Sequence, residues 1–123
     1  MIFDGETLDA IRTAAESEER YSEYAFQFVL ASVETMLSGL GERRHISGEE
    51  LLEGIRQIAT RQFGPMAKEV LNHWEVFTTR DLGNIVFSLI GAGLLEADSK
   101  DAIEDFDDIY DFKTVFEDDY YDG

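Results

Sequence analysis

The feature that most constrains this chain is a series of apolar residues at helical spacing, repeated in four stretches that helix-ending residues separate. One stretch places Leu51, Leu52, Ile55, Ile58 and Ala59 on one side of a helix, at the period of 3.6 residues per turn. The same period predicts four helices, over residues 22–39, 47–63, 65–74 and 79–90. Each helix is then expected to bury its apolar stripe against the others.

Residues typical of helix caps mark where these stretches begin. Ser47 and Glu50 have the spacing of a capping box, in which each side chain accepts a hydrogen bond from the other residue's backbone N–H. Thr78 and Asp81 repeat that spacing, and Pro65 suits the first position of a helix. A shorter helix is predicted from Asp4, followed by a polar link at 16–20. The fold class predicted is mainly α, with about five helices in one domain (residues 1–116) and an acidic tail (117–123) that frays.

Beyond Gly93 the helical pattern weakens. Ile103, Phe106, Tyr110 and Phe116 fit either a short helix or one arm of a small β-hairpin. A helix, a three-residue turn (75–77), a second helix and a Gly-Leu-Leu exit (93–95) together resemble a winged helix-turn-helix. That resemblance implies a wing near the C-terminus.

Charge narrows the classes of partner. The chain has 27 acidic and 10 basic side chains, for a net charge of −17, and residues 96–123 alone hold 12 of the acids with two lysines and six aromatics. Such a field repels nucleic acid and anionic lipid and attracts basic surfaces. We therefore expect a basic or mixed-surface protein partner, or a second copy of this chain, and neither nucleic acid nor a membrane.

Composition also limits chemistry and location. No cysteine is present, which excludes disulfides and thiolate metal sites. No apolar run approaches the ~20 residues that a membrane span needs. The first residues have neither the basic region nor the apolar run of a secretory signal, so a cytoplasmic protein is expected.

A longer pattern resembles a known family. The run Arg-His-Ile-Ser-Gly-Glu-Glu-Leu-Leu-Glu-Gly-Ile-Arg (44–56), followed by Phe-Gly-Pro (63–65), is similar to a small family of bacterial conserved hypothetical proteins. Residues 82–87 and 110–112 fit the same pattern, so the resemblance extends from about Tyr24 to Phe116. Members of that family have glycine after the tryptophan, where this chain has Glu75. The resemblance implies no activity, cofactor or site.

The aromatic and acidic residues near the C-terminus have two interpretations. In one, the rings cover the helical core while the acids face water. In the other, the rings anchor a partner and the carboxylates steer it. The candidate partner-binding residues are Phe106, Tyr110, Phe112, Phe116, Asp118, Asp119 and Tyr120. The leading hypothesis is a non-catalytic protein–protein interaction module with an acidic surface.

Two alternatives involve the few basic residues. A local basic patch of Arg43, Arg44, His45 and Arg80 would let a winged-helix-like regulator bind nucleic acid. A small enzyme would use His45 with nearby carboxylates, because imidazole transfers protons near neutral pH. The spacing of His45 and His73 matches no metal motif, and Ser47 is better suited to capping than to nucleophilic attack. We assign no catalytic residue, cofactor or metal.

Overall fold

Each of the four long helices begins at a side chain that accepts hydrogen bonds from its own first turn. Asp4 accepts from the Thr7 backbone N–H at 2.7 Å, and Ser22 accepts from that of Tyr24 at 3.1 Å. Ser47 and Thr78 both form the complete capping box that the sequence predicts. These bonds satisfy N–H groups that have no partner inside a helix.

The computed structural model describes residues 3–41, 45–96 and 101–119. Within them the helices are α1 (Gly5–Glu18), α2 (Glu23–Ser38), α3 (Gly48–Phe63), α4 (Ala67–His73) and α5 (Thr79–Gly91). Shorter helical turns are η1 (Gly64–Met66), η2 (Ile103–Phe106) and η3 (Lys113–Asp118), the last with π-helical bonding. The mainly α prediction is confirmed.

Among the α-helices, the boundaries of α4 and α1 differ most from those predicted. Pro65 lies in the 3₁₀ turn η1, and the α-helix proper begins at Ala67. Helix α1 runs through the predicted polar link as far as Glu18, because its Glu16 and Ser17 are exposed side chains that a helix tolerates. It ends where Glu19 adopts a left-handed conformation with φ of 59°.

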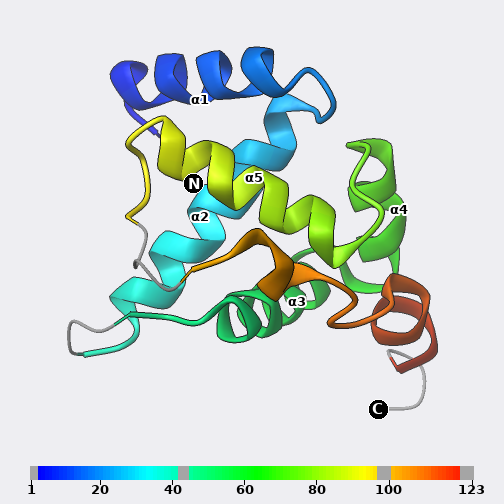
Figure 1. Cartoon of the computed structure of the whole chain (residues 1–123). Coiled ribbons are helices and arrows are strands. Elements are labelled where there is room, and N and C mark those ends of the chain that lie inside the picture. Colours follow the sequence, from blue (N-terminus) through cyan, green and yellow to red (C-terminus); the bar gives the residue numbers. More distant parts are fainter. Residues whose placement is uncertain (1–2, 42–44, 97–100, 120–123) are drawn as a thin grey trace.

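Helix α5 is at the centre of the arrangement and packs against α1, α2 and α3, while α4 packs against α3 (Figure 1). The core consists of side chains that all of these helices contribute. Its largest fully buried members are Ile11, Phe26, Leu30, Leu52, Ile55, Leu71, Leu82, Ile85, Leu89 and Phe116.

Of the two alternatives for the C-terminal segment, the small β-hairpin is not found, because the described residues contain no strand and Ile103–Phe106 and Lys113–Asp118 are helical. The segment 101–119 instead runs across α3 and α5 and ends beside α4 (Figure 1). Its backbone bonds to α5, because the Phe106 carbonyl accepts from the Thr79 hydroxyl at 2.6 Å. Residues 93–95, where the wing would begin, form turns and bends. Helical structure also continues through Asp118, beyond the predicted boundary at 116.

Candidate functional site

Three of the predicted partner-binding aromatics belong to the core. Phe106, Phe112 and Phe116 are 3%, 3% and 1% exposed. Phe112 and Phe116 pack edge to face with a centroid separation of 5.3 Å, and Tyr110 packs against both. Because so little of each ring is exposed, these three side chains mainly cover the helical core, as in the first of the two interpretations of the C-terminal sequence.

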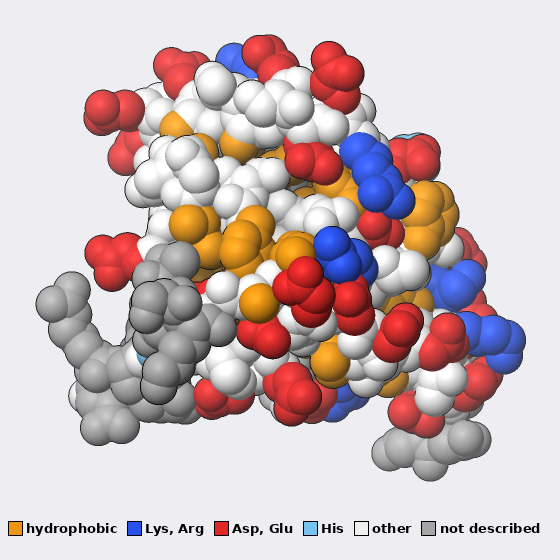
Figure 2. Space-filling view, in the orientation of Figure 1, with side chains coloured by type: hydrophobic (Ala, Val, Ile, Leu, Met, Phe, Trp, Pro, Cys, Tyr) orange, Lys and Arg blue, Asp and Glu red, His pale blue; other side chains and the backbone are white. Residues whose placement is uncertain are grey.

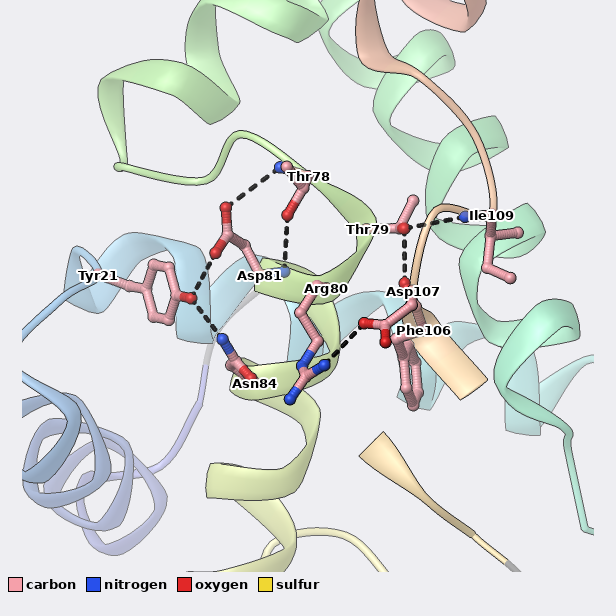
Figure 3. A network of polar contacts seen from close by, with 9 residues as sticks. All are labelled: Tyr21, Thr78, Thr79, Arg80, Asp81, Asn84, Phe106, Asp107 and Ile109. Carbon is pink, nitrogen blue, oxygen red and sulfur yellow. Dashed lines mark hydrogen bonds and ion pairs between the residues drawn. The ribbon is translucent and has the colours of Figure 1, made fainter. Parts of the chain in front are cut away.

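Hydrogen bonds fix the C-terminal segment to the helices beneath it (Figure 3). The Thr79 hydroxyl donates to the Phe106 carbonyl and accepts from the Ile109 backbone N–H at 3.2 Å. Arg80 donates to the Asp107 carboxylate at 2.7 Å. A rigid backbone therefore presents the acidic side chains of this segment.

Tyr110 makes a further link, to α3. Its hydroxyl donates to the Leu52 carbonyl at 2.7 Å. Burial raises the pKa of Tyr110, and the nearby Glu53 carboxylate raises it further. The neutral hydroxyl is therefore the form that stays in this bond.

A buried carboxylate fixes the loop between α4 and α5. Asp81 accepts from the Tyr21 hydroxyl at 2.6 Å and from the Thr78 backbone N–H at 3.1 Å (Figure 3). It also accepts from the Phe77 backbone N–H at 2.9 Å. Asn84 donates to the Tyr21 oxygen at 2.8 Å. Burial, and then the bond to Asp81, raise the pKa of Tyr21 to about 12. The network holds Phe77 at the surface, half exposed.

A small pocket lies between this loop and the C-terminal segment. Its volume is about 190 Å³, and its lining combines aromatic rings with carboxylates: Phe77, Thr78, Thr79, Asp108, Tyr110, Asp111 and Phe112. Carboxylates beside ring faces suit a cation, because charge and ring quadrupole both attract it. We call this site the aromatic–acidic pocket.

The two carboxylates of the pocket are held differently. Asp111 accepts from the backbone N–H and the hydroxyl of Thr114, at 3.1 and 3.3 Å. Asp108 is exposed, has a left-handed φ of 49°, and makes no side-chain hydrogen bond or ion pair within the described residues. Its charge is therefore available to a ligand.

The acidic residues at 117–119 either form ion pairs within the protein or are exposed to solvent. Asp118 pairs with Lys113 at 3.2 Å, and Glu117 pairs with Lys68 at 3.7 Å. Asp119 is exposed. The last predicted binding residue, Tyr120, lies outside the described residues. Figure 2 shows acidic side chains over α1 and over the C-terminal segment, with a band of hydrophobic side chains between them.

The predicted basic patch is only partly within the described residues. Arg80 is held on Asp107, and the His45 Nε2 lies 2.9 Å from a carboxylate oxygen of Asp101. Arg43 and Arg44 lie outside the described residues. Both described members of the patch therefore face a carboxylate.

Other chemistry has little support in the part of the chain that the structure describes. There, no three His, Asp or Glu side chains meet as metal ligands. The Ser47 oxygen accepts from the Glu50 N–H at 3.2 Å, as its capping role requires. Within the same residues no helix is long and apolar enough to cross a bilayer.

Of the seven residues that line the pocket, only Tyr110 and Phe112 were predicted to bind a partner, and the aromatic and acidic residues that the prediction missed carry the site. Phe77, Asp108 and Asp111 were not among the predicted binding residues. A large apolar residue in a short loop before a capping box was the available signal for Phe77. The acids had no such signal, because their place beside that loop depends on how the distant segment folds back.

No family model matches the chain, and no curated protein or solved structure matches it. Function is therefore inferred from the chain's own residues.

Proposed function

We propose that this protein is a non-catalytic protein–protein interaction module that binds a basic segment of its partner at the aromatic–acidic pocket. One observation carries the proposal: half-exposed Phe77 lies in one pocket with Asp108 and Asp111, on a loop and a segment that hydrogen bonds fix in place. The pocket's volume suits one arginine or lysine side chain.

The physical chemistry of such a pocket favours a cation. A guanidinium over an exposed ring gains ~0.5–1 kcal/mol from the ring quadrupole. The carboxylates add attraction and orient the charge. Because loop and segment are already fixed, little ordering is needed on binding, which leaves more of the interaction energy as affinity.

Net charge supports the same class of partner. With a charge of −17, the protein attracts a basic segment from a distance and speeds encounter. The rate of association should fall as salt rises, since exposed charges are screened beyond ~10 Å at 0.1 M.

The proposal is tested by affinity for a short peptide of alternating arginine and serine. Phe77→Ala and Asp108→Asn should each weaken binding about threefold, which is the loss expected for one cation–ring contact or one exposed charge pair. Isothermal titration calorimetry at low and high salt measures the change.

Matched controls separate the pocket from the general charge. Glu16→Gln removes one exposed charge on α1, and Met66→Ala removes one exposed apolar side chain elsewhere. Both should bind the peptide like the unmodified protein. Equal weakening by Glu16→Gln and Asp108→Asn would reduce the effect to net charge and contradict the proposal.

A second candidate is a small enzyme using His45. One contact favours it, the 2.9 Å approach of the His45 Nε2 to Asp101, because a carboxylate that orients an imidazole is half of a general acid–base pair. The neighbouring Ser47 uses its oxygen as a helix cap and supplies no nucleophile. This candidate therefore ranks below the interaction module.

A further inference from the structure

A second surface, distinct from the aromatic–acidic pocket, lies where α2 meets the ends of α3 and α4. Six residues of α2 line a groove of about 320 Å³: Tyr24, Phe28, Ala31 and Thr35, which form a stripe at helical spacing, and the polar Gln27 and Ser32 beside them. Ile58, Gln62, Phe63, Trp74 and Phe3 complete its walls. The groove and the pocket share no lining residue.

The floor of the groove is aromatic. Phe28, Phe63 and Trp74 pack against one another with ring centroids 5.3 to 5.8 Å apart. Tyr24 at the edge is 64% exposed. Phe28 is only 7% exposed, so the accessible ring surface belongs to Tyr24 and to the partly buried Phe63 and Trp74. Exposed rings over an apolar floor are typical of protein interfaces.

Two polar groups at the edge of the groove have no hydrogen-bond partner among the described residues. Neither the Trp74 indole N–H nor the Gln62 side-chain amide makes a hydrogen bond to any described residue. Interfaces combine an apolar centre with such groups at the rim.

Charge indicates which occupant fits. Asp4, Glu23, Glu34 and Glu75 each stand next in sequence to a residue that lines the groove, as do the basic residues Arg61 and His73. Glu23 pairs with Arg12 at 3.3 Å. Glu34 and Glu75 make no ion pair within the described residues. A second copy of a chain with charge −17 would be repelled here, whereas a basic partner would be attracted.

Shape indicates the form of the occupant. From Tyr24 to Thr35 the stripe runs roughly 17 Å along α2, at ~1.5 Å per residue, which is about three turns of a facing helix. The small Ala31 near its middle allows a close approach of that helix. We propose that this groove binds an amphipathic helix of a partner protein, with an apolar stripe that contacts the rings and basic residues on both flanks.

The proposal stands apart from the proposed function, which concerns the other site, and shares with it only the sign of the partner's charge. Trp74 is the single tryptophan of the chain and lies in the groove, so its fluorescence reports on occupancy. The probe is an amphipathic helical peptide of leucine and lysine without aromatic residues. A peptide with the same leucines, and glutamate in place of lysine, is its control.

The leucine–lysine peptide should shift Trp74 emission to shorter wavelength and protect it from acrylamide, and the leucine–glutamate peptide should do neither. Tyr24→Arg and Ala31→Arg should weaken binding about tenfold or more, by placing bulk and positive charge in the groove. Met66→Arg, the same charge change at an exposed apolar residue outside it, should leave affinity unchanged. Tyr24→Arg is the more secure variant because its side chain is mostly exposed and the fold does not depend on it.

The inference would be overturned by no response to the leucine–lysine peptide, by equal binding of the glutamate peptide, or by unchanged affinity in folded Tyr24→Arg. Protection of Trp74 by self-association without peptide would assign the groove to a second copy instead. Asp108→Asn should retain the Trp74 response. Failure of this proposal is therefore distinguishable from failure of the proposed function.

Discussion

Asp81 shows how one residue serves both local and distant structure. Its spacing from Thr78 predicts a capping box, and the structure confirms it. The same carboxylate is 3% exposed and also accepts from Tyr21, 60 positions earlier in the chain. A buried carboxylate is tolerated only when donors surround it. Local spacing predicts the cap, but no local signal predicts the tyrosine, because that contact exists only once α5 has packed.

Glu75 carries backbone strain that a substitution can relieve. Its φ is 67°, in the left-handed region that favours glycine, and its side chain is exposed. Glu75→Gly should therefore stabilise the protein by about 0.5–1 kcal/mol. This gain is the difference between the strain that glycine relieves and the greater conformational entropy that glycine gives the unfolded chain. The free energy of unfolding in urea measures this gain. Glu75→Ala is the control and should give none, since alanine keeps the Cβ that causes the strain.

At the scale of elements, the sequence predicts those helix boundaries that residues close in the chain determine. Helices α2, α3 and α5 begin within one residue of the predicted starts because Ser22, Ser47 and Thr78 cap their own first turns. For the segment 103–116 the sequence allows either a helix or a hairpin. Its course depends on Phe106, which packs over Gly83 of α5, and on the bond from Thr79. Such contacts join positions more than 20 residues apart and leave no periodic pattern.

Two glycines inside helices make a matched pair for testing this packing. A Cβ on Gly83 would lie 2.5 Å from the Phe106 ring and 2.6 Å from its Cβ, and that residue is buried. A Cβ on Gly54 would meet only the flexible end of Met36. Gly83→Ala should destabilise by about 1–3 kcal/mol, as overpacking does.

Gly54→Ala should instead be neutral or stabilising by up to ~1 kcal/mol, because alanine favours helix and Met36 can move. Thermal and urea unfolding of both variants check the contrast. Equal effects of the two substitutions would show that Phe106 does not pack against α5 as described.

At the scale of the whole molecule, the C-terminal segment buries its phenylalanines and leaves carboxylates at the surface. Phe106, Phe112 and Phe116 point into the core, which ties the segment down. Asp108 and Asp111 face the pocket beside Phe77. The sequence predicts an acidic surface from composition alone, but the place where acid meets exposed aromatic surface follows only from the folded chain.

The most direct test of the central claim is where a basic ligand binds. In a ¹H–¹⁵N correlation spectrum of the labelled protein, titration with the arginine–serine peptide should move the amide signals of residues 77–79 and 108–112 most. The exposed acids of α1, Glu6, Asp9 and Glu16, lie outside the pocket, and their amides should move little. Shifts concentrated on α1, or spread evenly over the acidic surface, would contradict binding at the aromatic–acidic pocket.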